Sequence, residues 1–340
     1  MSNLIIPRPD DFHVHLRDGD LMERVLPHTA GLFGRALVMP NLAQPITSAQ
    51  LMLEYRDRIL AAAPYGFEPL MTIYLTPHTT PEMILEARRA GAVACKFYPK
   101  DGTTNSGHGL DPGEFLGRHE WFEAMQQAGL VLCLHAEMNT IPDELAREHA
   151  FLKLLAHAEL PKRFPKLRMV IEHISTAAGI AYVDLYKNVG GTVTLHHLML
   201  TYEDARSNPH HFCMPIPKTM NDVQALNRAV LHGKNRRIFF GSDSAPHILS
   251  TKVGVPKPKA GVFSSPVLLP KLAEHFADNH RSHQLLDFVA VNGAEFYGLE
   301  PPQGQVELVH EPYRVPEAER DPDALVPFLA GRPIRWNVRT

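Results

Sequence analysis

The sequence predicts a single (β/α)8 TIM barrel, and three observations indicate it. Short apolar runs alternate eight times with longer segments that have a helical pattern of apolar and polar residues. Such alternation is typical of a parallel sheet, because a crossover between parallel strands needs a long connection. The length of 340 residues suits one α/β barrel. No G-x-G-x-x-G motif follows the first apolar run, which disfavours an open dinucleotide-binding sheet.

The eight predicted strands cover residues 11–16, 36–40, 70–75, 93–98, 130–135, 168–173, 192–197 and 238–243. Several predicted helices have clear end signals, and they cover residues 51–63, 81–90, 122–128 and 221–232. Thr80 before Pro81 is a typical helix start, and Asn221 is the expected cap of the last of these helices. Glycines at 91, 129 and 233 suit the ends of three helices.

We expect the whole chain, residues 1–340, to form one domain. The barrel should span about residues 8–298. The tail, residues 299–340, is rich in proline and charge and contains an apolar cluster at 325–336. This cluster predicts that the tail packs back on the barrel instead of forming a second domain.

The composition argues against several classes of partner. The formal net charge is −3 and no block of basic residues is present, so nucleic acid and anionic membranes are not expected partners. No run of 18 apolar residues predicts a membrane span, and the N-terminus has no signal-peptide pattern. The three cysteines, Cys95, Cys133 and Cys213, include no C-x-x-C pair. We interpret them as reduced residues of a cytoplasmic protein, with the first two in the core.

A His-x-His motif lies in the first predicted strand. His13 and His15 are two residues apart, so they share one face of a strand, while Phe12 and Val14 take the other. Two imidazoles on one face can converge on one metal ion. Taken alone, the motif fits two buried, hydrogen-bonded histidines better than a metal site.

The other predicted strands add ionisable groups at the end where barrel enzymes carry their active sites. Each group alone has a structural explanation, such as a hydrogen-bonded histidine or an aspartate in a turn. Together they indicate a metal centre. The groups are Lys96, His135, His173 and Asp243, from the fourth, fifth, sixth and eighth strands. A lysine in an apolar strand is costly to bury as a cation, so its pKa should fall or it should meet an anion.

This constellation resembles the dihydroorotases, specifically the shorter class found in many bacteria as a free-standing enzyme of the amidohydrolase superfamily. The resemblance covers nearly the whole chain. Its blocks are RPDDFHVHLRDGD (8–20), RALVMPNL (35–42), KFYPKDGTTNSGHG (96–109), HAE (135–137), EHISTAAG (172–179), GSDSAPH (241–247), VNGAEFYGL (291–299) and LVPFLAG (325–331).

The resemblance implies a centre of two Zn²⁺ per subunit. His13, His15 and Asp243 would hold the first ion, and His135 and His173 the second. Lys96, carboxylated on its side-chain nitrogen, would bridge the two. Histidine nitrogens and carboxylate oxygens are ligands that suit zinc. Asp243 would also act as the catalytic acid and base.

The resemblance also implies the substrate contacts and the reaction. Those contacts would come from His15, Leu16, Arg17, Asn41, His135, Met214, His247, Ala260 and Gly261, and Thr103 and Thr104 would belong to a mobile loop. The implied reaction is the reversible, zinc-dependent hydrolysis of (S)-dihydroorotate to N-carbamoyl-L-aspartate in pyrimidine synthesis. The implied assembly is a homodimer.

The chain departs from the family pattern outside the implied metal ligands. Ser242 replaces a common threonine, and Met214 replaces a common leucine. Some relatives have a cysteine cluster before the Ala-Gly pair, where this chain has Lys257-Pro258-Lys259. That change alters the loop beside the substrate.

Several histidines and glutamates lie outside the implied set of ligands and substrate contacts. We predict a structural role for His196 and His197 at the end of the seventh strand, and an exposed loop for His210 and His211. Glu137 and Glu172 flank ligand histidines, and the sequence leaves open whether they orient the imidazoles or point outward.

Two alternative functions stay open. A related cyclic amidohydrolase such as a hydantoinase would share the metal ligands, but Arg17, Asn41 and His247 favour a ring that bears a carboxylate. A non-catalytic homologue that serves as an assembly partner would be expected to lose metal ligands, which this sequence keeps.

Overall fold

The computed structural model describes residues 3–300, 303–317 and 321–339, and its centre is a sheet of eight parallel strands. Each strand pairs with its sequence neighbours, and a parallel bridge between Val14 and Ser244 links the two ends of the sheet. The predicted barrel fold is therefore confirmed. Its strands are β2 (Asp10–Val14), β3 (Arg35–Val38), β4 (Glu68–Tyr74), β5 (Ala94–Phe97), β6 (Val131–Leu134), β7 (Met169–Ile171), β8 (Val189–Val193) and β9 (Ile238–Phe240).

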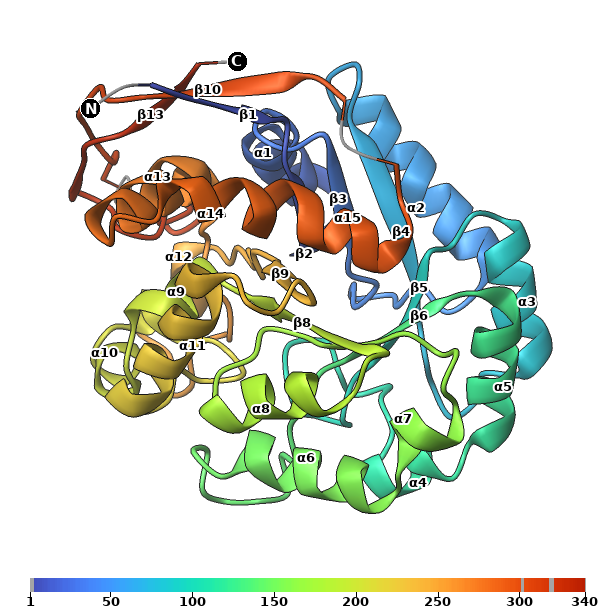
Figure 1. The fold of residues 1–340 in the computed structure, drawn as a ribbon. Coiled ribbons are helices and arrows are strands. Elements are labelled where there is room, and N and C mark those ends of the chain that lie inside the picture. Colours follow the sequence, from blue (N-terminus) through green and yellow to red (C-terminus); the bar gives the residue numbers. More distant parts are fainter. Residues whose placement is uncertain (1–2, 301–302, 318–320, 340) are drawn as a thin grey trace.

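Helices surround these strands (Figure 1). The longer ones are α1 (Gly19–Ala30), α2 (Ala49–Ala62), α3 (Pro81–Arg89), α5 (His119–Ala128), α6 (Arg147–His157), α8 (Ala177–Leu185), α11 (Met220–His232) and α13 (Leu268–Asp278). The shorter ones are α4 (Pro112–Leu116), α7 (Leu160–Arg163), α9 (Leu195–Met199), α10 (Tyr202–Ser207), α12 (Leu249–Lys252), α14 (Ser282–Leu286) and α15 (Asn292–Tyr297). Three single turns complete the set: η1 (Pro209–His211), η2 (Ser265–Val267) and η3 (Asp287–Val291).

Most predicted helix ends agree with the structure. The Thr80 side chain accepts a hydrogen bond from the Met83 amide at the start of α3, and Gly129 and Gly233 end their helices in the left-handed conformation. The predicted cap of α11 is wrong. Thr219 caps this helix instead of Asn221, and its side chain and that of Asp222 bond each other's backbone amides.

The predicted seventh strand is also placed wrongly. The strand β8 begins at Val189 and ends at Val193, and residues 195–199 form the helix α9. Gly190 and Gly191 have no apolar side chain, so the sequence pattern did not indicate the start of the strand. The glycine at 191 is needed because a Cβ there would lie 2.3 Å from Ile174 Cδ1.

The interior of the barrel is packed with side chains near the amino ends of the strands. Phe12, Leu70, Val131 and Phe239 belong to this cluster, and Tyr297 from α15 stacks on the Phe12 ring with a centroid distance of 4.8 Å. The short helix α15 therefore plugs the amino end of the barrel. The carboxyl end stays available for polar side chains.

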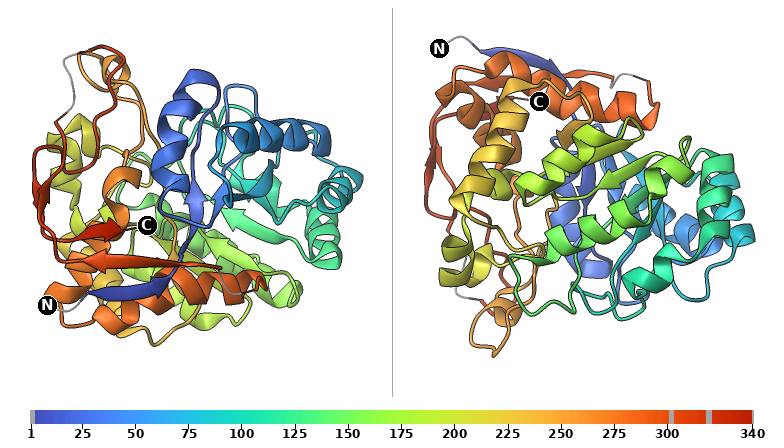
Figure 2. Two further views of the ribbon diagram at one scale, coloured as in Figure 1. Left: turned by 90° about the horizontal axis from the view of Figure 1, so that it is seen from above. Right: turned by 60° about the horizontal axis from the view of Figure 1, so that its bottom comes forward.

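The two ends of the chain form a small antiparallel sheet outside the barrel, in which β10 (Gln305–Val309) lies between β1 (Leu4–Pro7) and β13 (Asn337–Arg339). Figures 1 and 2 show β1 and β10 side by side. The short strands β11 (Tyr313–Arg314) and β12 (Pro333–Ile334) pair with each other. None of the described helices combines the length and apolar character that a membrane crossing requires.

Candidate active site

The first group of predicted ligands converges at the carboxyl end of the barrel. Nε2 of His15 lies 3.1 Å from Oδ1 of Asp243, and Nε2 of His13 lies 3.4 Å from the same oxygen. The three side chains offer ligand atoms that all lie within 4.8 Å of one another. This spacing suits one metal ion.

The second predicted pair lies beside the first group. Nδ1 of His135 and Nε2 of His173 are 3.2 Å apart, and the rings of His173 and His13 have centroids 5.0 Å apart. Both residues of the pair are buried. Their two facing nitrogens can bind a common cation.

Lys96 is fully buried in β5. Its Nζ has no hydrogen-bond partner among the described residues and lies 5.0 Å from the centre of the Tyr98 ring. Burial lowers the pKa of this amine, as the sequence predicted. A buried amine that lacks a proton is a nucleophile suited to carbon dioxide.

These side chains pass a test for metal binding. Nε2 of His13 and Nζ of Lys96 are buried polar atoms without partners in the described part of the chain. Such orphaned atoms are rare, because an unpaired buried polar group costs about 1–3 kcal/mol. Their convergence with Asp243 and three more histidines indicates a site built for cations.

Buried carboxylates hold the histidines in position. Oε2 of Glu172 lies 2.8 Å from Nδ1 of His13 and accepts the Thr192 hydroxyl at 2.7 Å. Burial opposes ionisation of Glu172, but the His13 contact keeps the pKa of this carboxyl below its usual value. Glu137 lies 3.3 Å from Nε2 of His135 and 3.4 Å from Nζ of Lys218. The question that the sequence left open is therefore answered in favour of orientation.

The backbone is strained at three of these positions. Arg17, His173 and Asp243 have positive φ angles of 63°, 41° and 42°. Side chains disfavour this region, and such strain is concentrated at functional sites. The turns that follow β2, β7 and β9 therefore direct these side chains at a cost in conformational energy.

A polar group borders the metal-binding residues on one side. Nη2 of Arg17 lies 3.1 Å from Nε2 of His247, and that nitrogen is 3.0 Å from the Ala260 carbonyl oxygen. Nε of Arg17 donates to the Pro246 carbonyl oxygen at 3.0 Å. The arginine is thus fixed beside the site, where its remaining donors can meet an anion.

The loop that carries Thr103 and Thr104 covers the site. The Thr104 hydroxyl donates to the Ala260 carbonyl oxygen at 3.2 Å, and the Asn41 amide donates to the Thr104 carbonyl oxygen at 2.9 Å. The cavity beneath the loop has a volume of only about 10 Å³. This conformation is closed.

Replacement of Thr104 by valine tests the closed loop. The variant keeps the shape but loses the hydroxyl donor to Ala260, so we expect kcat/KM to fall roughly threefold to tenfold, which is the value of one hydrogen bond. Steady-state kinetics measures the change. The same substitution at the exposed Thr140 should have no effect, and equal losses in both variants would contradict the role of Thr104.

Lys252 at the end of α12 joins three segments around the site. Its Nζ donates to the carbonyl oxygens of Phe212, Lys259 and Gly261 at 3.1, 2.7 and 2.8 Å. Burial lowers the pKa of this amine to about 8. No pattern in the sequence indicated this role, because a single lysine in a loop region is usually exposed.

We expect the Lys252→Met variant to be less stable by about 2–4 kcal/mol, because three carbonyl oxygens lose a charged donor. Thermal unfolding measures the effect. Lys252→Arg keeps the charge and serves as the comparison, and an unchanged melting temperature of the methionine variant would contradict this account.

Most of the predicted site residues line the cavity beneath the loop. They are His13, His15, Arg17, Asn41, Thr103, Thr104, His135, His173, Met214, Asp243, Ala260 and Gly261. Leu16 does not line it, because its side chain packs in the hydrophobic core. Tyr98 and Ala245 line the cavity and were missed. The alternation of a strand could have indicated Tyr98, which shares a face with Lys96.

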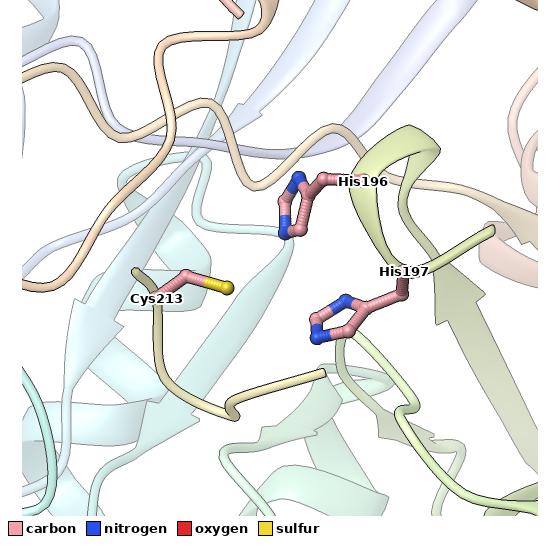
Figure 3. A group of neighbouring side chains, drawn as sticks. All are labelled: His196, His197 and Cys213. Carbon is pink, nitrogen blue, oxygen red and sulfur yellow. The ribbon is translucent and has the colours of Figure 1, made fainter. Parts of the chain in front are cut away.

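Figure 3 shows a second histidine cluster, in which the sulfur of Cys213 points toward the His196 and His197 rings. The two histidines lie in α9 and not at the end of a strand as predicted. The nitrogens of His197 already contact the Thr194 hydroxyl at 2.9 Å and the Pro215 carbonyl oxygen at 3.0 Å. His210 and His211 form part of η1 and are half-buried, so the prediction of an exposed loop was wrong.

Comparison with known proteins places this geometry in a family. Residues 5–308 match the model of the amidohydrolase family. The dihydroorotase of Azoarcus sp. (strain BH72) is 42% identical over 348 residues, which cover 99% of this chain and 100% of the relative. The chain belongs to the dihydroorotase family.

Solved structures agree with this assignment. A dihydroorotase from Saccharomyces cerevisiae, in complex with 5-fluoroorotic acid, superposes with a TM-score of 0.94 at 34% identity, covering 100% of this chain and 99% of that one. The L-hydantoinase of Arthrobacter aurescens shares the fold with a TM-score of 0.81 at 20% identity, covering 98% and 82%. The dihydroorotase family is metal-dependent, and His13, His15 and Asp243 form a candidate metal-binding group here.

Proposed function

We propose that this protein hydrolyses (S)-dihydroorotate to N-carbamoyl-L-aspartate and catalyses the reverse ring closure. Membership of the dihydroorotase family over the full chain supports this reaction. The observation that carries it is the position of Arg17 beside the cluster of His13, His15 and Asp243. A cyclic amide that bears a carboxylate can meet the arginine while its ring amide meets the cluster.

The proposed cofactor is a pair of zinc ions. His13, His15 and Asp243 would hold one ion, His135 and His173 the other, and a carboxylated Lys96 would bridge them. Carboxylation would turn the Lys96 amine into an anion with two oxygens, and the unpartnered burial of this amine supports it. When bound, two such ions supply a hydroxide at neutral pH and polarise a carbonyl group.

Asp243 would move the proton of the reaction. Its carboxylate lies in the space that His13, His15 and the cavity share, so it can accept a proton as water attacks the ring amide. It would then deliver this proton to the ring nitrogen that leaves. General acid–base catalysis of this kind contributes about 10²–10⁴-fold to the rate.

The remaining side chains would bind and orient the substrate. Arg17 offers a bidentate fork to the carboxylate, and Asn41 and His247 would hold the ring from either side. His15, His135, Met214, Ala260 and Gly261 line the same space or border it. Leu16 would contact the substrate through its backbone, because its side chain packs in the core. Thr103 and Thr104 would exclude water from the closed site.

The finer features of assembly are part of the same proposal. We infer a single-domain subunit, residues 1–340, with the barrel at about 8–298 and the tail at 299–340, and a homodimer in the cytoplasm. Light scattering of the purified protein measures the assembly. A monomer at all concentrations would contradict the dimer.

Turnover of L-dihydroorotate, followed by loss of its ultraviolet absorbance, tests the function when zinc is determined in the same sample. Turnover with close to two zinc ions per chain is the expected result. Zinc without turnover would support the metal centre and would make hydantoins the next substrates to test. Neither zinc nor turnover after addition of metal and bicarbonate would favour a non-catalytic assembly partner.

A further inference from the structure

A second, larger cavity adjoins the active site. We call it the outer chamber, and four parts of the chain line it: residues 101–105, Asn139 with Arg147, Phe212 with Met214, and residues 257–260. Its volume is about 370 Å³, against about 10 Å³ for the cavity beneath the loop. The outer chamber therefore offers a shaped space next to the closed site.

The two cavities share part of their walls. Thr103, Thr104, Met214 and Ala260 line both. The hydrogen bond from Thr104 to Ala260 therefore lies in the partition between them. When this bond opens, the active site and the outer chamber become continuous, so the chamber lies on a path to the metal-binding residues.

The lining of the outer chamber is cationic. It includes Arg147, Lys257 and Lys259, whereas Asp101 is its one carboxylate in the part of the chain that the structure describes. None of the three cations has a carboxylate oxygen within 4.0 Å among residues 3–300, 303–317 and 321–339. The chain as a whole has a net charge of −3, so this local excess of positive charge does not follow from composition.

The cationic rim is held in place by the backbone. The Lys259 carbonyl oxygen accepts a hydrogen bond from the buried Nζ of Lys252, and the Lys259 amide donates to the Thr251 carbonyl oxygen at 3.1 Å. Pro258 restricts the backbone between the two lysines. Lys257 and Lys259 thus keep their side chains at the chamber, although both are exposed to solvent.

The charge of the reactants matches this arrangement. Hydrolysis consumes dihydroorotate, which has one carboxylate, and water, and it yields N-carbamoyl-L-aspartate with two carboxylates and a proton. Arg17 can pair with one carboxylate. We propose that the outer chamber is an anion-attracting entrance that favours the dianionic open-chain reactant over the monoanionic ring through Lys257, Lys259 and Arg147. This inference rests on the proposed function.

The test is a charge reversal, Lys257→Glu together with Lys259→Glu. Each substitution changes the charge by two, so the pair changes it by four. Because solvent screens these charges, we expect KM to rise only about threefold for dihydroorotate and about tenfold for N-carbamoyl-L-aspartate. The ratio of the two KM values should therefore rise about threefold.

Thermodynamics restricts which kinetic parameters this charge reversal can change. The enzyme does not alter the reaction equilibrium, so kcat/KM must fall by the same factor in both directions. The charge preference therefore appears as a change in the ratio of the two KM values with an equal change in the ratio of the two kcat values, and both ratios should return toward the wild-type values at high ionic strength. A general distortion of the loop would lower activity without that dependence on salt.

The matched control is Lys187→Glu together with Lys234→Glu. Both lysines are exposed and precede β8 and β9 at the amino end of the barrel, so the control has the same net charge but a different charge position. It should keep the wild-type KM ratio. An unchanged ratio in the Lys257/Lys259 variant, or an equal change in the control, would overturn the proposal.

A failure of the proposed function can be distinguished from a failure of the proposed entrance. If the wild-type protein turned over neither compound, that function would fail. The charge preference would then be measured from the dissociation constants of the two compounds by calorimetry, with the same variants. Equal effects on both constants would overturn the entrance as well.

Discussion

The Asp243→Ala variant is expected to retain less than about one thousandth of wild-type turnover. The substitution removes the proposed proton carrier, whose role is typically worth about 10²–10⁴-fold, and one metal ligand with it. Steady-state hydrolysis of dihydroorotate measures the loss. Turnover above a few per cent would show that the acid–base assignment is wrong.

Asp243→Asn separates the two roles of this residue. The amide oxygen can still bind a metal ion, but the side chain cannot accept a proton at neutral pH. We expect zinc content near the wild-type value together with a loss of turnover close to that of the alanine variant. Asp57→Ala, at an exposed position in α2, is the matched control and should keep full activity.

The Lys96→Arg variant is expected to lose both turnover and most of the bound zinc. Arginine keeps a long cationic side chain but does not lose its proton, so it cannot form a carbamate. It also places a permanent positive charge beside His13 and Asp243, where the proposed bridge would carry a negative one. Turnover below about one hundredth of wild type, with less than one zinc ion per chain, is the expected result.

A spectroscopic experiment tests the modification itself. Metal-loaded protein prepared in ¹³C-bicarbonate should show one carbamate carbon resonance in the wild type and none in Lys96→Arg. Circular dichroism checks that the variant is folded. Full zinc content and turnover in the arginine variant would contradict a bridging Lys96.

Seven of the eight strands could be predicted from the sequence, because each has branched or aromatic residues that pack on two faces. The strand β8 could not be placed, because Gly190 and Gly191 make it inconspicuous in the sequence. Gly191 packs closely against Ile174, and Gly190 packs against Phe239 and Phe296. The cap of α11 was placed two residues late, since Asn221 and Thr219 are both good capping residues and only the backbone path decides between them.

The residues of the site also divide into those that the sequence predicted and those that it did not. The ligand types at the strand ends pointed to a metal centre, and the structure brings His13, His15, His135, His173 and Asp243 together around Lys96. Residues that act through backbone contacts were not predictable. Lys252 binds three carbonyl oxygens, a role that no side-chain pattern encodes, and the outer chamber exists only because four distant segments meet.

The small sheet in which β10 separates β1 from β13 has a practical consequence. Both terminal strands flank one central strand, and β1 leads into the amino end of β2, the end that α15 plugs. A purification tag or a fused reporter at either terminus would therefore leave the molecule on the side opposite to the reactants. Changes to the loops at the carboxyl end would therefore leave such handles and the packing around α15 unchanged.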